Sequence, residues 1–549
     1  MEPNPLRKLL FPFLLGLAVV FGIAIGYLLP GSASPQTSSR AVSSDDKMQD
    51  VMQYILNEYV DTLNPKKFQD EAITAMLSKL DPHSSYIPAT ELEHVTEQLE
   101  GNFDGIGVEF NIQRDTIMVV AAITGGPSEE LGIQSGDRIV KIEGKTVAGK
   151  KITNEDVIKQ LRGKSGTKVK VSIFRPGQKN LRDFTITRGK IPIYSVDASV
   201  MLDQQTGYIK ISRFAATTYE EYLKAFKELS MKGMKKLILD LRDNPGGYLN
   251  AAVDLSDEFL PKGKKIVYTE GQARPRENYT ATAKGGFESG DLVVLIDEGS
   301  ASASEIVSGA IQDNDRGWVV GRRSFGKGLV QEEIRFDDGS AMRLTIARYY
   351  TPTGRCIQRP YDQGTDEYYH EIAERMSGTT AKKDAADKKD SLAYKTPSGR
   401  TVYGGGGVMP DVTIDSDTSG YSEYLAKVVS NGLINRFSFE YVDARRKELK
   451  NRYPSAENFA SQFPVNGLLS EFYAFAANNG VSNDPKGQSV SSSIISNQLQ
   501  ALIGRALYGN SGFYLSQTRN DAAVKKALEL LRSGKLVTRS QQEPTKQKS

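Results

Sequence analysis

Residues 291–306 read DLVVLIDEGSASASEI, and this stretch decides the fold. The apolar run Leu292–Ile296 is typical of a buried β-strand. A helix is predicted over Ser304–Gln312, so Ser302 lies where a strand passes into a helix. Active sites of α/β sheets are built at such strand ends, and the stretch therefore marks a candidate site as well as a core element.

A second segment of the same kind follows. The apolar run Trp318–Val320 precedes SFGKGLVQ, residues 324–331, which places Lys327 beyond another predicted strand. A serine hydroxyl is a weak nucleophile until a base takes its proton, and a desolvated lysine can do so if its pKa falls from about 10.4 to about 7 to 8. Gln331 lies on the same face as Lys327 if this segment is a strand. The pattern predicts a Ser–Lys pair with a neutral amide beside the lysine.

The surrounding residues alternate between strand and helix patterns. Such a βαβ rhythm indicates an α/β core with parallel strands, which we assign to residues 191–415. Its other predicted strands are Gly207–Ile211 and Lys236–Leu241, and its other helices are Thr218–Met231 and Ala251–Phe259. A hairpin is predicted from Glu332–Phe336 and Ala341–Tyr349, which are joined by Asp337, Asp338 and Gly339.

Residues 100–190 have the pattern of a smaller, β-rich module. Its predicted strands are Gly107–Ile112, Thr116–Ala122, Asp137–Ile142, Lys168–Phe174 and Asp183–Thr187. One helix, Asn154–Arg162, interrupts them. The module therefore forms a separate domain inserted before the α/β core.

The N-terminal segment 9–29 carries no charged residue. At 1.5 Å per residue it is about 30 Å long, which is the thickness of a bilayer core. Arg7 and Lys8 precede it, so the positive-inside rule places residues 1–8 in the cytoplasm and the remainder outside. We expect a single transmembrane anchor followed by a flexible tether, residues 30–46. The small residues Gly31–Ser34 leave a cleaved signal peptide as the alternative.

Helices are predicted at both ends of the folded part. In the region 47–99 one helix runs over Met48–Leu80 until Asp81 and Pro82 end it, and a second runs over Thr90–Gln98. Residues 416–549 are mostly helical and end in a polar tail, Ser540–Ser549. A homo-oligomer formed through this C-terminal region is one interpretation. Lys382–Asp390 is a charged run typical of a surface insertion.

Composition narrows the function classes. The 549 residues include 70 basic and 67 acidic side chains, a net charge of +3, which argues against nucleic acid as the main partner. A single cysteine, Cys356, excludes an internal disulfide and a multi-cysteine zinc site. Three histidines leave few candidates for a Ser-His-Asp triad, of which His83 is the best. No HExxH segment is present. We predict no metal and no organic cofactor.

Six ordered segments together resemble the C-terminal processing peptidases, also called tail-specific proteases. The resemblance covers roughly residues 45 to 415. The segments are Leu80–Tyr86, Gly105–Val108, Asp240–Gly247, Gly299–Ile306, Ser324–Gln331 and Tyr349–Arg355. The resemblance implies a crotonase-like α/β peptidase core with an inserted PDZ domain over residues 100–190.

The resemblance also implies roles for individual residues. Ser302 would be the nucleophile, Lys327 the general base and Gln331 the residue that orients the lysine. The amides of Gly247 and Ala303 would form the oxyanion hole. In the PDZ domain a carboxylate-binding loop would consist of four residues. They are Gly105, Ile106, Gly107 and Val108.

Two of these segments also allow a structural interpretation. Ser302 and Glu305 have the spacing of a capping box at a helix start, a role that is compatible with a nucleophile at the positive end of a helix dipole. Ser300 and Ser304 are rival nucleophiles, and the family pattern selects Ser302. Gly404–Gly407 is interpreted as a turn, because no Gly-Lys-Ser/Thr follows it.

The predicted function is a membrane-anchored serine endopeptidase of the inner membrane, with its catalytic part on the periplasmic side. Its partners would be polypeptides that the PDZ domain binds by their C-termini. Two alternatives belong to other classes. One is a catalytically silent PDZ scaffold, and the other is a crotonase-like acyl-transfer enzyme.

Overall fold

A computed structural model describes residues 16, 19–20, 47–376 and 392–534. The chain divides into two compact units, Met1–Ala72 and Ile73–Ser549. The described ranges contain no helix with the length and apolar character needed to cross a membrane. Apart from residues 16, 19 and 20, the predicted anchor 9–29 lies outside the described residues. So do residues 1–8, the tether 30–46, the charged run 382–390 and the tail 540–549.

The prediction of one helix over Met48–Leu80 is wrong. The structure has two helices there, α2 (Lys47–Glu58) and α3 (Pro65–Leu77). The backbone amide of Lys67 donates to Asn64 Oδ1 at 3.1 Å, so Asn64 caps α3 and Pro65 takes its first position. Proline favours that position because its missing N–H has no partner inside the helix there. The predicted second helix is present as α4 (Ala89–Glu100).

The core is a six-stranded sheet whose five successive strands β11, β12, β15, β16 and β21 are parallel, as the alternating pattern predicts. An antiparallel strand, β10, flanks β11 at the edge. The strands are β10 (Val196–Met201), β11 (Thr206–Ile211), β12 (Lys236–Asp240), β15 (Asp291–Ile296), β16 (Trp318–Gly321) and β21 (Val412–Thr413). Parallel strands covered on both faces are apolar throughout, which explains the continuous apolar runs in the sequence.

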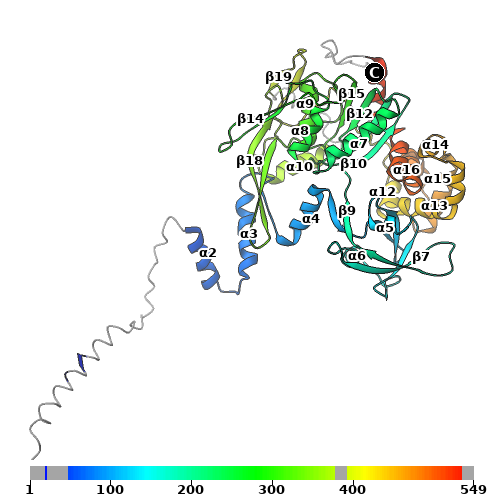
Figure 1. The fold of residues 1–549 in the computed structure, drawn as a ribbon, viewed down its shortest axis with the longest axis horizontal. Coiled ribbons are helices and arrows are strands. Elements are labelled where there is room, and N and C mark those ends of the chain that lie inside the picture. The colour runs from blue at the N-terminus through cyan, green and yellow to red at the C-terminus, as the bar shows by residue number, and fades with distance from the viewer. Residues whose placement is uncertain (1–15, 17–18, 21–46, 377–391, 535–549) are drawn as a thin grey trace, which may run out of the picture. The chain divides into compact units, whose positions relative to one another are not determined.

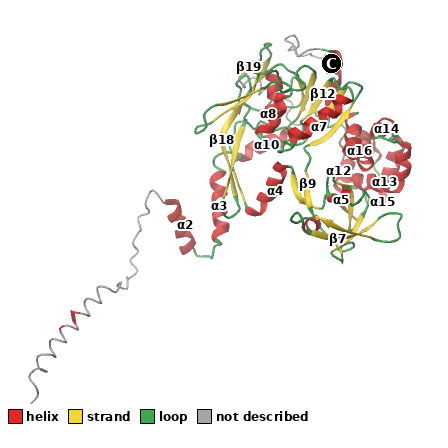
Figure 2. Ribbon diagram, viewed as in Figure 1, coloured by secondary structure: helices red, strands yellow, loops and turns green. Residues whose placement is uncertain are grey.

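Different helices cover the two faces of this sheet (Figure 1, Figure 2). The helices α7 (Thr218–Met231), α8 (Leu249–Asp257) and α9 (Ala303–Asp313) share one apolar cluster with Leu237 and Val294. The neighbouring strand residues Ile238 and Val293 belong to a second cluster, with α17 (Ala522–Ser533) and the end of α16 (Pro485–Thr518). The C-terminal region therefore completes the core instead of forming a detached module.

A second, antiparallel sheet stands beside the first. It contains β1 (Ser85–Ile87), β13 (Lys265–Glu270), β14 (Glu277–Thr280), β17 (Leu329–Arg335) and β18 (Ala341–Tyr350). The predicted hairpin is present as β17 and β18, and its turn includes Gly339 at φ 86°. The central strand β18 pairs with β1, β13 and β17. The short strand that follows the N-terminal helices and the strand that follows Lys327 are therefore both hydrogen-bonded to β18.

The β-rich module has its own apolar core. Its strands are β3 (Val108–Gln113), β4 (Thr116–Ala122), β5 (Arg138–Ile142), β6 (Lys145–Thr146), β7 (Lys168–Phe174) and β8 (Arg182–Thr187), and its helices are α5 (Pro127–Glu130) and α6 (Asn154–Leu161). The chain enters through β2 (Asn102–Gly105) and leaves through β9 (Gly189–Pro192), which pair with each other. Entry and exit side by side are typical of an inserted domain.

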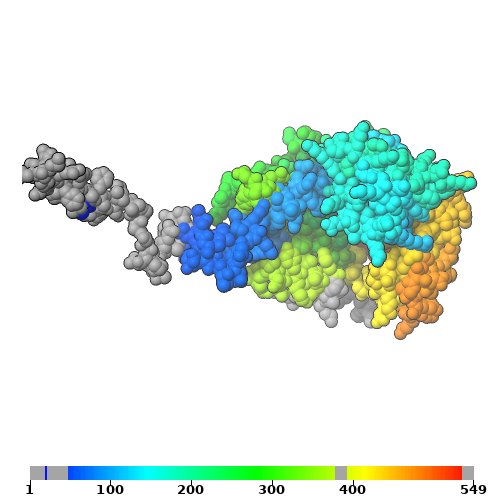
Figure 3. Space-filling view, turned by 90° about the horizontal axis from the view of Figure 1, so that it is seen from below, coloured from blue at the N-terminus to red at the C-terminus, as the bar shows by residue number. Residues whose placement is uncertain are grey.

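The remaining described residues include α10 (Thr365–Met376), the short pair β19 (Ala393–Lys395) and β20 (Thr401–Tyr403), and the C-terminal helices. The C-terminal helices before α16 share an aromatic-rich cluster with it. They are α12 (Glu423–Ser430), α13 (Leu433–Arg452), α14 (Ala456–Gln462) and α15 (Asn466–Asn478). In Figure 3 the surfaces of the β-rich module and of these helices meet, and ion pairs cross between them.

Candidate active site

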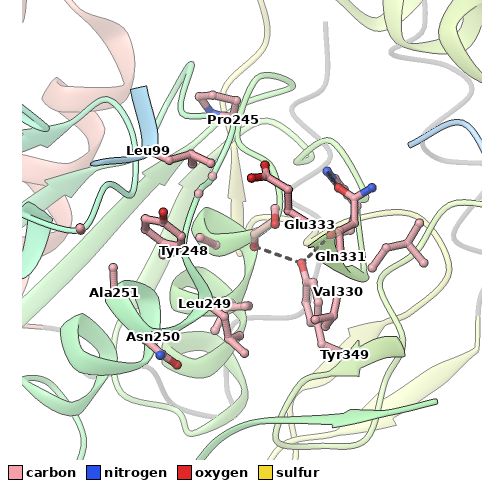
Figure 4. A pocket seen from close by; sticks show the side chains of 18 of the residues that line it. Leu99, Pro245, Tyr248, Leu249, Asn250, Ala251, Val330, Gln331, Glu333 and Tyr349 are labelled. Carbon is pink, nitrogen blue, oxygen red and sulfur yellow. Dashed lines mark hydrogen bonds between the residues drawn. The ribbon is translucent and has the colours of Figure 1, made fainter. Parts of the chain in front are cut away.

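A cavity of about 830 Å³ brings together every residue predicted for the catalytic site. Its lining includes Ser302, Ala303, Lys327, Gln331 and Gly247. Gly247 follows β12, Ser302 and Ala303 follow β15, Lys327 precedes β17, and Gln331 lies in β17. Figure 4 shows Pro245, Tyr248 and Leu249 on one side of the cavity, with Gln331, Glu333 and Tyr349 on the other.

Ser302 stands at the N-cap of α9 in a strained conformation, with φ 53° and ψ −111°. A non-glycine residue with positive φ costs about 1–3 kcal/mol and persists only where the surroundings hold it. Here the Ser302 amide donates to Glu305 Oε2 at 2.8 Å, which fixes the turn. The serine is therefore presented at the positive end of a helix that is buried along its whole length.

The hydroxyls of the two rival serines, Ser300 and Ser304, both make hydrogen bonds to the backbone. Ser300 Oγ donates to the Leu241 carbonyl at 2.9 Å and accepts from the Asp297 amide at 2.9 Å. Ser304 Oγ donates to the Asn244 carbonyl at 3.0 Å. Both serines are fully buried, whereas Ser302 is partly exposed in the cavity wall. Of the three serines, Ser302 alone lines the cavity.

Lys327 and Gln331 meet, although not as neighbours on one strand. Lys327 lies before the first residue of β17, and the pairing with β18 shifts register between Val330 and Gln331. Lys327 Nζ donates to Gln331 Oε1 at 2.8 Å, and Gln331 Nε2 donates to the His83 carbonyl at 2.6 Å. The carbonyl thus decides which end of the amide faces the lysine.

Burial, together with the nearby charge of Arg343, lowers the pKa of the Lys327 ammonium to about 8. The carboxylates of Asp81 and Glu305 act in the opposite direction. Desolvation disfavours the charged form of an amine, and a neighbouring cation does the same. The cavity therefore holds a lysine that is able to accept a proton near neutral pH.

Glu305 ties the serine segment to the lysine segment. Its fully buried carboxylate accepts from the amides of Ser302, Gly326 and Lys327 at 2.8, 2.7 and 2.9 Å, and from Ser324 Oγ at 2.5 Å. Burial raises the pKa of this carboxyl, and the hydrogen bonds oppose that shift. Sequence reasoning identified only its capping role.

Tyr349 makes a second link between the same two segments. Its hydroxyl lies 3.0 Å from the Ser302 carbonyl oxygen and 2.7 Å from the Lys327 carbonyl oxygen, shown as dashed lines in Figure 4. Tyr349 belongs to β18 and is buried. The relative position of Ser302 and Lys327 is thus fixed by hydrogen bonds to their backbones from Glu305 of α9 and Tyr349 of β18.

Gly246 and Gly247 are required because the backbone there packs closely, Gly246 against the serine and Gly247 against Phe214. A Cβ on Gly246, at φ 97°, would lie 2.7 Å from Ser302 Cβ, and one on Gly247, at φ 149°, would lie 2.0 Å from the Phe214 carbonyl oxygen. Among the hydrogen bonds of the described residues, none uses the amide of Gly247 or Ala303 as donor. Both residues line the cavity, so two N–H groups beside Ser302 are available to a ligand.

The Asp81–Ser84 turn is a part of the site that sequence reasoning missed. Asp81 Oδ1 accepts from the amides of His83 and Ser84 at 2.8 and 2.9 Å, and Oδ2 accepts from Ser84 Oγ at 2.6 Å. This turn aims the His83 carbonyl at Gln331. The signal was the segment Asp81-Pro82-His83-Ser84, which sequence reasoning interpreted as a helix stop and as part of the family resemblance, without a role in the site.

The structure gives no histidine the place of a triad base. The His83 ring lies 2.9 Å from the Tyr368 hydroxyl, and burial together with the charge of Lys327 lowers its pKa to about 4. His94 and His370 are largely exposed and do not line the cavity. Cys356 is outside the cavity too, and burial raises the pKa of its thiol. In the described part of the chain no cluster of three or more His, Cys, Asp or Glu residues is arranged to hold a metal.

The loop predicted to bind a peptide carboxylate precedes β3. Ile106 is buried and Gly107 has φ 75°. The carbonyl of Ile106 accepts from Ser128, and that of Gly107 accepts from the Ile123 amide. The amides of Ile106 and Gly107 donate to no acceptor in the described ranges. The loop therefore directs its carbonyls into the module and leaves two N–H groups unused.

Comparison with known proteins gives a consistent result. Residues 205–366 match the family described as Peptidase family S41, residues 105–187 match the PDZ domain, and residues 424–509 match a family of unknown function. The chain is 36% identical over 332 residues to the carboxy-terminal processing protease CtpB of Bacillus subtilis strain 168, which covers 60% of this chain and 68% of that protein.

The chain is also similar to two further C-terminal processing proteases. The carboxy-terminal processing protease CtpA of the same bacterium is 34% identical over 357 residues, which covers 64% of this chain and 76% of that protein. Among solved structures, a photosystem II D1 C-terminal processing protease is 29% identical, with a TM-score of 0.36 and coverage of 68% of this chain and 87% of the other.

Proposed function

Because the chain belongs to the S41 family of carboxy-terminal processing serine proteases and carries a PDZ domain, we propose that Ser302 and Lys327 are its catalytic dyad. One observation carries this proposal. Lys327 is buried, has its pKa lowered to about 8, and shares a cavity with a strained serine and two unused amides.

In the first step Lys327 Nζ, in its neutral form, takes the proton from Ser302 Oγ as that oxygen attacks the scissile carbonyl carbon. The carbonyl oxygen becomes an oxyanion, which accepts hydrogen bonds from the amides of Gly247 and Ala303. The tetrahedral intermediate collapses when the C–N bond breaks and Lys327 returns the proton to the departing amine. An acyl-enzyme on Ser302 remains.

The second half repeats these steps with water. Lys327, neutral again, takes a proton from a water molecule that attacks the acyl carbon. Ser302 Oγ leaves and takes the proton back, which releases the new C-terminus. Gln331 holds the amine in place throughout, and as a neutral amide it does so without stabilising the ammonium as a carboxylate would.

The lowered pKa explains why a lysine can serve as base. An ordinary lysine with a pKa of about 10.4 is neutral in less than about one molecule in a thousand at pH 7. With a pKa of about 8, about a tenth of the molecules have a neutral Lys327 at that pH. Since the neutral form is required, kcat/KM rises with pH through about 8 and then levels off.

Proteolysis of casein by the full chain in detergent micelles tests the dyad. We expect Ser302→Ala and Lys327→Ala each to lose about 10³-fold or more in activity without a change in melting temperature. Ser304→Ala is the matched serine control, since its hydroxyl bonds only to the Asn244 carbonyl. Cleavage by Ser302→Ala at the wild-type rate would refute the assignment of the nucleophile.

The PDZ domain is proposed to bind the C-termini of substrate polypeptides. β3 lies at the edge of its sheet and pairs only with β4, so a peptide can add as a further strand. The unused amides of Ile106 and Gly107 would donate hydrogen bonds to the terminal carboxylate. Fluorescent decapeptides with an apolar last residue should bind at least tenfold more tightly with a free carboxylate than with a terminal amide. Equal affinity would contradict this proposal.

Segment 9–29 is proposed to anchor the protein in the inner membrane, with the peptidase on the periplasmic side. The uncharged segment and the preceding Arg7 and Lys8 support this proposal. The test is fractionation of cells that produce either the full chain or residues 43–549 behind a cleavable signal peptide. The full chain should stay with the membranes in alkaline carbonate and be released by detergent. Release by carbonate alone would refute an integral anchor.

A further inference from the structure

Two arginines, Arg335 and Arg343, line the cavity besides Lys327. Arg343 lines it together with Lys327 and Ser302, and three-quarters of its side chain is buried. One of its guanidinium nitrogens, Nη2, lies 2.9 Å from Glu333 Oε2. In the mechanism above, neither residue contacts the substrate or the reacting atoms, so their presence in the cavity wall needs another explanation.

Arg343 is held firmly in place. It lies near the start of β18, where its backbone is paired with Ser85 of β1 on one side and Glu333 of β17 on the other. Residues directly opposite each other on antiparallel strands have adjacent side chains, so Glu333 sets the position of the guanidinium. Glu333 also accepts from Arg335 Nε at 3.1 Å, and its negative charge is therefore shared between two arginines.

Two carboxylates act on the pKa of Lys327 in the opposite direction. Asp81, from the turn before β1, and Glu305, from α9, each favour the ammonium form. Both carboxylates accept several hydrogen bonds from other groups, which disperse their charge. His83 has a pKa of about 4 and is neutral at working pH, and Gln331 carries no charge. Arg343 is thus the cation among the groups that act on Lys327.

We propose that Arg343 is a positioning residue of the reaction, whose fixed positive charge favours the uncharged, proton-accepting form of Lys327. The inference rests on the proposed function, in which Lys327 is the base. Burial removes solvent from the amine, and Arg343 adds electrostatic repulsion that burial alone does not supply. Glu333 moderates this repulsion, because it partly neutralises the guanidinium.

The arrangement predicts opposite effects for two neutralising substitutions. Arg343→Gln removes the cation, so Lys327 should hold its proton to higher pH. Glu333→Gln leaves Arg343 unpaired, so Lys327 should lose its proton at lower pH. Arg343→Lys keeps a positive charge at the same position and should restore most of the wild-type behaviour. A residue that only supports the fold would not produce shifts of opposite sign.

The experiment measures kcat/KM for fluorescein-labelled casein between pH 6 and pH 10, with the full chain in detergent micelles. For Arg343→Gln we expect the acidic limb to move up by about 0.5 to 1 pH unit, a three- to tenfold loss at pH 7 and a plateau near the wild-type value. For Glu333→Gln the acidic limb of the kcat/KM profile should move to lower pH. Melting temperatures report whether each variant is folded.

Two controls separate the possible failures. If Lys327→Ala retains the wild-type pH profile, the lysine is not the base and the proposed function itself fails. If Lys327→Ala is inactive while Arg343→Gln loses activity equally at every pH, the dyad stands and the role of Arg343 is refuted. Equal shifts in the same direction for Arg343→Gln and Glu333→Gln would refute it too. Wild-type behaviour of Arg343→Lys together with opposite shifts supports it.

Discussion

The C-terminal helices contact two neighbours in chemically different ways. Against the central sheet, α17 packs apolar side chains such as Val524 and Leu531, which are 1% and 3% exposed. Against the PDZ domain the contacts include ion pairs and a hydrogen bond. They are Arg138–Asp443 at 2.9 Å, Arg114–Glu440 at 2.9 Å, Arg505–Glu109 at 2.6 Å and Arg446–Ser135 at 3.2 Å.

This difference separates a permanent attachment from a reversible one. Apolar surface buried against the sheet cannot be exposed without a large cost in free energy, of about 25 cal/mol for each Å². The ion pairs to the PDZ domain are partly exposed, and exposed pairs contribute about 0 to 1 kcal/mol each, because water solvates the separated charges nearly as well. The helices therefore belong to the peptidase core, whereas the PDZ domain can leave them without unfolding either partner.

The largest effect is expected from a charge placed in the apolar contact. Val524→Asp puts a carboxylate into the apolar contact between α17 and the sheet. We expect the free energy of unfolding to fall by about 3 to 5 kcal/mol, or the chain to fail to fold. Urea denaturation followed by tryptophan fluorescence measures the loss, since Trp318 belongs to the same apolar cluster.

Lys525→Asp is the matched control, because Lys525 follows Val524 on α17 and is exposed. It should change stability by less than about 0.5 kcal/mol. If Val524→Asp is as stable as this control, α17 does not complete the core and the comparison above is wrong.

A smaller effect is expected at the other contact. Asp443→Asn removes the charge that pairs with Arg138, whose side chain is about a quarter exposed. The stability of the peptidase core should change by no more than about 1 kcal/mol. Hydrogen exchange should become faster in β4 and β5 of the PDZ domain while the central sheet stays protected.

Glu471→Gln is the corresponding control for that variant. Glu471 pairs with Arg445 of α13 at 3.1 Å, so the pair lies within the C-terminal helices and does not involve the PDZ domain. This variant should leave exchange in β4 and β5 unchanged. Equal acceleration in both variants would mean that loosening of the helices, and not loss of the contact with the PDZ domain, is responsible.

Much of the fold follows from local sequence patterns. The runs Leu292–Ile296 and Lys236–Leu241 predict strands because parallel strands covered on both faces are apolar throughout. The same reasoning missed the break between α2 and α3, although Asn64 and Pro65 together signal a helix start. It also missed that α17 covers the sheet. An amphipathic helix shows that one face is buried, but not which partner buries it.

The candidate site also has a part that the sequence predicts and a part that it does not. Ser302, Lys327 and Gln331 were predicted together because strand ends and a family pattern point to them, and the structure places all three at one cavity. The contacts of Glu305 with the lysine segment, the contact of the His83 carbonyl with Gln331 and the place of Arg343 in the cavity wall could not be predicted. They join residues far apart in sequence, and their chemistry depends on distances that only the packed sheets determine.

The smallest and most specific effect concerns salt. Charges interact over about 10 Å at 0.1 M salt and about 3 Å at 1 M, so added salt weakens exposed ion pairs and leaves buried apolar contacts intact. Raising NaCl from 0.1 to 1 M should speed hydrogen exchange in β4 and β5 of the wild-type chain by a few-fold at most. In Asp443→Asn the same change in salt should have less effect, because one of the screened pairs is already absent. Salt-independent exchange in the wild type would mean that the approach of α16 to β4, and not the ion pairs, holds the PDZ domain. The contacts of the C-terminal helices with the central sheet and with the PDZ domain would then differ in the area they bury and not in their chemistry.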